Sequence, residues 1–195
     1  MSEIPPRSPH LLSAEDCVLL VVDLQERLLP TIRGADQIEK NASVLIQAAA
    51  RLSIPTLASE QYPEKLGPTV PSLACYLPQR DSKRMFSCRE LFPKWDTLWG
   101  ETRRHAILIG IESHVCILQT AFDLLSLGWN VSLPIDALGS QKQIDHDTAI
   151  QRLGSEGAIL TTSDGVLLEW IETSTHPDFK TISQWIKEKA ANDAR

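Results

Sequence analysis

The sequence has no excess of positive charge and no long apolar segment. It has 19 Lys and Arg against 25 Asp and Glu in 195 residues, a formal net charge of -6. Nucleic-acid binding usually requires clustered Lys and Arg, so we expect no nucleic-acid partner. The longest apolar run, Cys17 to Val22, stops at Asp23, far short of the roughly 18 residues of a membrane span. We therefore expect no membrane partner either.

Cysteine is also scarce. The chain has four cysteines, Cys17, Cys75, Cys88 and Cys116, without a C-x-x-C pair and without a His spaced like a zinc ligand. Four are too few for a disulfide framework in a chain of this length. We therefore expect four reduced thiols.

What the sequence does contain is typical of one folded domain. Its hydrophobic content is 43%, and no linker, repeat or low-complexity tract divides it. The first ten residues, MSEIPPRSPH, are polar and lack the order of a secretory signal peptide. We expect a flexible tail over residues 1–12, a single domain over 13–190 and a C-terminal tail over 191–195, in a cytoplasmic protein.

Short apolar runs rich in β-branched residues alternate with helical patterns along the chain. Expected strands cover 17–22, 54–59, 105–110, 130–135 and 158–162, with 83–87 as a weaker candidate. Expected helices cover 36–52, 115–127, 141–153, 165–173 and 178–189. This alternation predicts a three-layer α/β/α sandwich with a mostly parallel, Rossmann-like sheet of about six strands.

Three residues near strand ends have side chains suited to nucleophilic catalysis. In parallel α/β folds, ligands bind beyond the carboxyl ends of the strands, where Asp23, Lys83 and Cys116 are expected. A helix N-terminus and a nearby ammonium favour the thiolate of Cys116, and Asp23 is suited to exchange the thiol proton. The alternatives are a small buried Cys, a helix-capping Asp and a solvated Lys.

Four segments carry a resemblance that favours the catalytic interpretation. They are LLVVDLQERLLP, SEQYPEKLGPTVPSL, SKRMFS and GIESHVCILQTAFDLLSLGWNVSLPIDALGSQ. Together they resemble the isochorismatase-like cysteine hydrolase family, above all its isochorismatase-domain-containing branch, from about Cys17 to the last helix. The resemblance implies that Asp23, Lys83 and Cys116 form a catalytic triad. Because side chains alternate along a strand, only one of Lys83 and Arg84 can face the site, and Lys83 matches the motif.

The resemblance also implies a local backbone feature and an assembly. It implies a cis peptide between Ile111 and Glu112, and an oxyanion hole formed by the amides of Glu112 and Cys116. Members of the family form dimers or larger homo-oligomers, so we expect a homo-oligomer here.

Further residues near these motifs are candidates for substrate binding. We expect the pocket to be lined by Gln25, Tyr62, Phe86, Ile111 and His114, with core or loop packing as the alternative for each. His114 lies only two residues before Cys116, so we place it at the pocket edge rather than in a Cys-His pair. Asp136 and Ser140 follow a strand where side-chain oxygens often cap a helix, and we interpret both as structural.

The chain departs from the nicotinamidases of this family at their metal site. Those relatives carry a D-x-H pattern and further His residues after the second strand, whereas no His occurs here between His10 and His105. We therefore expect no metal and no cofactor. The implied activity is hydrolysis of a small amide, carbamoyl or related C–N substrate through a thioester. A vinyl-ether hydrolase of the isochorismate type is the alternative chemistry.

A rival hypothesis is a catalytically silent interaction or scaffold protein on the same fold. Its basis is a set of large aromatic residues outside the main periodic patterns, Phe92, Trp95, Trp99, Trp129 and Trp170, which mark an interface if exposed. The alternative is that they pack against the sheet.

Overall fold

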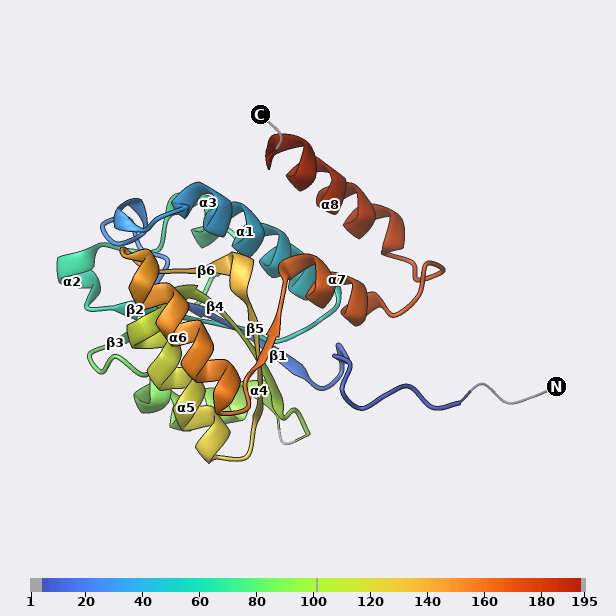
Figure 1. The fold of residues 1–195 in the computed structure, drawn as a ribbon, viewed down its shortest axis with the longest axis horizontal. Helices are drawn as coiled ribbons and strands as arrows, with labels where there is room; N and C mark the ends of the chain where they lie inside the picture. The colour runs from blue at the N-terminus through green and yellow to red at the C-terminus, as the bar shows by residue number, and fades with distance from the viewer. Residues whose placement is uncertain (1–4, 101, 194–195) are drawn as a thin grey trace.

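The protein, described by a computed structural model over residues 5–100 and 102–193, is built around a single sheet of seven strands (Figure 1). The strands are β1 Cys17–Val22, β2 Thr56–Gln61, β3 Asp81–Lys83, β4 His105–Ile111, β5 Asn130–Pro134, β6 Leu138–Gly139 and β7 Ile159–Thr161. All named strands pair in parallel, in the order β3-β2-β1-β4-β5-β7, and β6 pairs with β4.

Helices cover both faces of this sheet. One face carries α1 Ala35–Arg51, α7 Ser163–Ile171 and α8 Phe179–Asp193. The other carries α4 Phe92–Trp99, α5 Leu118–Ser126 and α6 Gln143–Ser155. Two short helices, α2 Pro63–Leu66 and α3 Pro71–Ala74, lie between β2 and β3. The predicted three-layer sandwich is confirmed, with the two-residue β6 in addition to the six expected strands.

The pattern of β1 explains why the sheet is buried on both sides. Its odd-numbered residues join the core beneath α1 and α7, whereas its even-numbered residues join the core beneath α4 and α5. Alternate side chains of a strand point to opposite faces, so both sets must be apolar. The continuous run Cys17 to Val22 therefore favours a central strand.

The large aromatic residues belong to the core, which removes the observation behind the scaffold hypothesis. Trp95 is fully buried, and Phe92, Trp99 and Trp129 are at most 8% exposed. The rings of Trp99 and Trp129 lie with centroids 4.6 Å apart. These residues occupy α4 and the segment before β5, where they cover one face of the sheet. Trp170, 2% exposed, packs in the core on the other face.

A glycine allows β4 to approach β1 closely beside the first strand end. Gly110 has φ 123°, and a Cβ built there would lie 2.0 Å from the carbonyl oxygen of Val22. Only glycine fits this position. The residue directly after Val22 is Asp23, so this contact sets the spacing between the ends of β1 and β4.

The segment before β1 contacts α7. Arg7 donates hydrogen bonds to the carbonyl oxygens of Leu12 and Glu169, at 2.6 and 2.8 Å, and Leu12 is buried. Residues 1–4 of the expected N-terminal tail lie outside the described residues. The expected C-terminal tail overlaps the last residues of α8, and 194–195 lie outside them as well. No helix in the described part of the chain is long and apolar enough to span a bilayer.

Candidate active site

The carboxyl ends of β1, β2, β3 and β4 bring the three predicted catalytic side chains together. In the sheet register, Val22 lies beside Ser59 and Gly110, and Gln61 lies beside Lys83. Asp23 directly follows β1, and Lys83 is the last residue of β3, which covers residues 81–83 rather than 83–87. Cys116 lies in a π-helical turn, Ser113–Ile117, between β4 and α5.

Asp23 and Lys83 form an ion pair in the interior. The Lys83 Nζ lies 2.7 Å from Asp23 Oδ2, and neither side chain is exposed. Asp23 itself has φ 56°, a left-handed conformation that Asp tolerates better than most residues. Burial is the largest single cause and lowers the pKa of Lys83, but the raising effects of the surrounding groups, with Asp23 first, together outweigh it, so the pKa of the ammonium is raised. Lys83 is therefore charged in this site.

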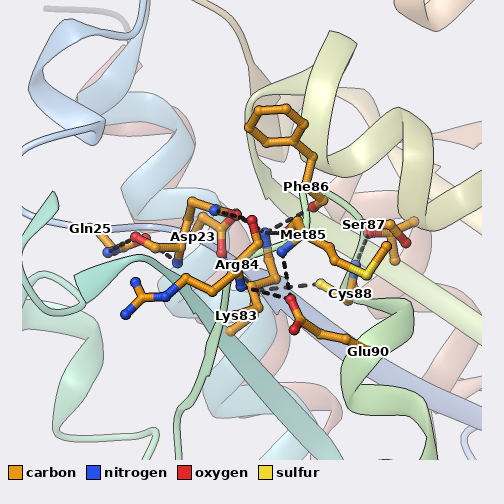
Figure 2. A network of polar contacts seen from close by, with 12 residues as sticks. Asp23, Gln25, Lys83, Arg84, Met85, Phe86, Ser87, Cys88 and Glu90 are labelled. Carbon is orange, nitrogen blue, oxygen red and sulfur yellow. Dashed lines mark hydrogen bonds and ion pairs between the residues drawn. The ribbon is translucent and has the colours of Figure 1, made fainter. Parts of the chain in front are cut away.

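The Lys83 ammonium is held by three further oxygen atoms. It donates to Gln61 Oε1 at 2.7 Å, to the carbonyl oxygen of Phe86 at 2.9 Å and to that of Met85 at 3.3 Å. Figure 2 shows Lys83 directed into this network and Arg84 directed away from it. Arg84 pairs with Glu64 at the surface, as the alternation of side chains requires.

Cys116 is a buried thiol in contact with the same carboxylate. The residue is 7% exposed. Burial is the main cause that raises the pKa of the thiol, and the negative charge of Asp23 and a hydrogen bond with that carboxylate raise it further. Lys83 opposes this only in part. Burial and the neighbouring carboxylate thus favour the protonated thiol and oppose the ammonium, which the sequence predicts to favour the thiolate.

Sequence reasoning missed three residues, Ser59, Gln61 and Cys88, which bond the Asp23–Lys83 pair directly or through one further hydrogen bond. The Ser59 hydroxyl donates to Asp23 Oδ1 at 2.7 Å, and the Cys88 thiol donates to Ser59 Oγ at 3.5 Å. Burial, followed by the charge of Asp23, raises the pKa of Cys88 to about 11. Ser59 and Gln61 are two residues apart on β2 and therefore share a face. That spacing, at the end of a predicted strand, was the available signal.

The turn before Cys116 has the expected cis peptide bond between Ile111 and Glu112. The backbone carbonyl of Glu112 accepts hydrogen bonds from the amides of Val115 and Ile117, at 3.0 and 3.2 Å. Its carboxylate accepts from the amide of Gln141 at 2.9 Å. The first two contacts lie within the turn, and the third attaches it to the segment just before α6.

The residues expected to line the pocket fall into two groups. Gln25 and Ile111 are fully enclosed by protein. The Gln25 amide bonds both the N–H and the C=O of Gln61, at 2.7 and 3.0 Å, so Gln25 holds the end of β2. Phe86 and Tyr62 face solvent, at 54% and 40% exposed, and the Arg84 guanidinium lies 3.7 Å from the centre of the Tyr62 ring.

The remaining sequence candidates, His114, Ser140 and Asp136, contact other polar groups of the protein. His114, with 34% of its side chain exposed, places Nδ1 3.0 Å from Ser140 Oγ. Asp136 accepts hydrogen bonds from the amide and hydroxyl of Ser163, at 2.7 and 2.5 Å, so it caps the start of α7. Within residues 5–100 and 102–193, no three His, Cys, Asp or Glu side chains gather in a way that could hold a metal ion.

Comparisons with known proteins agree with this arrangement. A family model described as the isochorismatase domain matches residues 17–165. The isochorismatase domain-containing protein 2A of Mus musculus is 39% identical over 175 residues, covering 89% of this chain and 84% of the relative. A structure titled as the MAR1 ribonuclease of Caenorhabditis elegans matches with a TM-score of 0.81 and 36% identity, over 90% of this chain and 92% of that one.

A more distant structure shares the fold. The ycaC gene product of Escherichia coli, described as an octameric hydrolase of unknown specificity, matches with a TM-score of 0.84 and 23% identity over 97% of this chain and 99% of that one. The fold and the strand-end site thus define an α/β protein of the isochorismatase-like class, whose structural neighbours include hydrolases. This chain belongs to the isochorismatase domain family.

Proposed function

We propose that this protein is a cysteine hydrolase in which Cys116 is the nucleophile, Asp23 the proton acceptor and donor, and Lys83 the fixed positive charge. One observation carries the proposal: the buried Cys116 thiol lies near enough to the Asp23 carboxylate for this group to raise its pKa, and the same carboxylate lies 2.7 Å from a buried ammonium. A purely structural thiol needs neither partner. Burying an ion pair is costly, which favours a functional reason for keeping it.

The raised pKa of the thiol fits a mechanism in which the proton moves only on attack. Cys116 Sγ bonds the electrophilic carbon of the substrate while its proton passes to Asp23. Asp23 then protonates the leaving nitrogen, the C–N bond breaks and a thioester remains. Water attacks this thioester, gives one proton to Asp23 and releases the acid. The Cys116 thiolate that leaves recovers this proton from Asp23.

Lys83 and the turn have supporting roles in this scheme. The Lys83 ammonium lies close enough to the thiol to stabilise negative charge on sulfur, as its lowering effect on the pKa of Cys116 indicates. We assign the oxyanion hole to the amide of Glu112, which belongs to the cis peptide, and to the amide of Cys116. Residues that face solvent at this edge, Tyr62, Phe86 and His114, are the candidates for substrate contact.

The substrate class we propose is a small amide, carbamoyl or related C–N compound, hydrolysed without a metal or cofactor. The mechanism needs only the three side chains and the turn. The same groups also suit a vinyl-ether substrate, since a carboxylic acid can protonate the alkene carbon. We further propose a homo-oligomer that acts in the cytoplasm. Its support is the octameric state given for the ycaC product and the four free cysteines of this chain.

Selective labelling of cysteine tests the proposed nucleophile without a known substrate. Cys75 is exposed and serves as an internal reference for an ordinary thiol. A buried thiol with a raised pKa and no base labels more slowly than Cys75. If Asp23 takes the proton, Cys116 instead reacts with iodoacetamide faster than Cys75 at pH 7, as measured by peptide mass spectrometry. Asp23→Asn removes this advantage.

Turnover gives the second part of the test. A hydrolysis screen of small amides, ureides, vinyl ethers and RNA identifies the substrate class, and Cys116→Ala abolishes that activity with an almost unchanged thermal midpoint. Cys88→Ala is the matched control, because it removes a neighbouring buried thiol and keeps the triad. Persistent activity in Cys116→Ala, or labelling of Cys116 at or below the rate of Cys75, contradicts the proposal.

A further inference from the structure

The C-terminal end of strand β2 contacts both charged members of the proposed triad. Ser59 and Gln61 lie two residues apart and present their side chains to the same face of the strand. Ser59 bonds Asp23, and Gln61 bonds Lys83, each at 2.7 Å. Glu60, between them, bonds Thr69 and Arg80 instead. One strand thus carries separate contacts for the carboxylate and for the ammonium.

The direction of each hydrogen bond follows from the chemistry of the groups. An ionised carboxylate only accepts, so the single proton of the Ser59 hydroxyl goes to Asp23 Oδ1. The lone pairs of Ser59 then accept from Cys88, whose raised pKa keeps its S–H protonated. An ammonium only donates, so Gln61 presents its carbonyl oxygen to Lys83, while its Nε2 donates to the carbonyl oxygen of Arg84 at 3.0 Å.

These contacts leave the two oxygens of Asp23 in different environments. Oδ1 is bonded to Ser59, whereas Oδ2 lies beside Lys83. A carboxylate fixed in this way cannot rotate freely when it accepts a proton. The backbone of Gln61 is held in turn by the buried side-chain amide of Gln25. Gln25 thereby fixes the end of β2, the strand that carries both Ser59 and Gln61.

We propose that Ser59 and Gln61 are positioning residues of the hydrolase, with Ser59 orienting Asp23 and Gln61 orienting Lys83. This inference rests on the proposed function, because it assigns roles that act through the triad. Neither residue touches the substrate in this scheme. Their two roles differ, since one stabilises the charged form of the base and the other fixes the position of the positive charge.

The pH dependence of Cys116 labelling separates the two roles. We measure labelling by iodoacetamide from pH 3 to 9, so that the range includes the ordinary titration of a carboxyl group, and normalise it to Cys75 in the same sample. Ser59→Ala moves the acid limb to higher pH by on the order of one unit, because the anionic carboxylate loses a donor. Gln61→Met leaves the acid limb in place and lowers the plateau by roughly tenfold, because the ammonium is no longer held beside the sulfur.

Two further variants control for general damage to β2. Glu60→Gln perturbs the same strand on the opposite face and leaves the labelling profile unchanged, whatever it does to stability. Ser59→Cys keeps a weaker donor of similar size, so the acid limb of its labelling profile shifts less, in the same direction. This variant takes the place of Ser59→Ala if Ser59→Ala does not fold. Circular dichroism confirms that each variant is folded.

The outcomes distinguish this inference from the proposed function. If wild-type Cys116 labels faster than Cys75 but the Ser59 and Gln61 variants overlay the wild-type profile, the positioning roles are wrong and the nucleophile stands. An equal effect of Glu60→Gln also overturns the roles. If wild-type Cys116 has no labelling advantage, the proposed function fails first and the positioning roles fail with it.

Discussion

Single residues in this protein owe their properties to where the strand ends place them. Lys83 and Arg84 are neighbours of similar charge, yet one is enclosed and the other lies at the surface. The Cys116 thiol would have an ordinary pKa in water. Burial and a carboxylate raise that pKa, and for this reason the mechanism that we propose lets proton transfer accompany attack rather than precede it.

A double-mutant cycle at residue scale tests whether the buried pair behaves as a unit. Lys83→Met leaves the Asp23 charge buried without its ammonium and costs about 3–5 kcal/mol of unfolding free energy. Asp23→Asn likewise leaves the buried ammonium without its carboxylate. The double variant loses less than the sum, because no uncompensated charge remains. Urea unfolding followed by circular dichroism measures all four proteins, and strictly additive losses argue against a coupled pair.

At the scale of elements, a buried lysine links α8 to the start of α7. Lys189 is 7% exposed, and its ammonium donates to Ser163 Oγ at 2.5 Å and to Asp164 Oδ1 at 2.6 Å. Ser163 in turn bonds Asp136, so the contact joins α8 to the capped start of α7. Ile182 provides the fully buried apolar contact of the same helix.

Removing this contact is expected to loosen α8 without affecting the triad. Lys189→Met leaves Ser163 and Asp164 without their donor and costs about 1–3 kcal/mol. Amide hydrogen exchange in α8 speeds up, whereas exchange in β1 and the relative labelling of Cys116 stay unchanged. The matched control is Lys187→Met, an exposed lysine of the same helix. Equal exchange in both variants contradicts an anchoring role.

At the scale of the whole molecule, buried titratable groups define a pH range of stability. Burial raises the pKa of Cys17 and of Cys88 from 9.0 to about 11. Burial also lowers the pKa of His105 and of His146 below 6.5. In each case the folded state favours the neutral form, whereas the unfolded chain ionises at the ordinary pKa.

The sign of the pH dependence follows directly. Above pH 9.0 the unfolded chain loses thiol protons that the folded protein keeps, so the unfolding free energy falls as pH rises towards 11. Below pH 6.5 the unfolded chain binds histidine protons first, so the free energy falls as pH drops. Cys17→Ala flattens the alkaline decline by on the order of 3 kcal/mol at full ionisation, and the exposed Cys75→Ala does not. Urea midpoints from pH 5 to 11 measure both effects, and a decline unchanged by Cys17→Ala contradicts this origin.

Parts of the fold and site could be predicted because they depend on local pattern. The run Cys17 to Val22 reports a strand buried on both faces, and the identity of Asp23, Lys83 and Cys116 follows from family motifs. The weaker elements were harder to predict. The short β3 begins two residues and ends four residues earlier than expected. Helix α4 was not predicted at all, because Phe92 and the nearby tryptophans owe their burial to the sheet they cover.

The sequence by itself determined the alternation of strands and helices, the continuous apolar character of the central strands and the chemical types available at their ends. These are local properties, since the spacing of apolar residues along the chain differs between strands and helices. Tertiary structure alone decided that β2 supplies Ser59 and Gln61 to the charged pair and that burial and the Asp23 carboxylate raise the pKa of the Cys116 thiol. Sheet register, burial and charge proximity are relations between distant segments, and they exist only once the chain has folded.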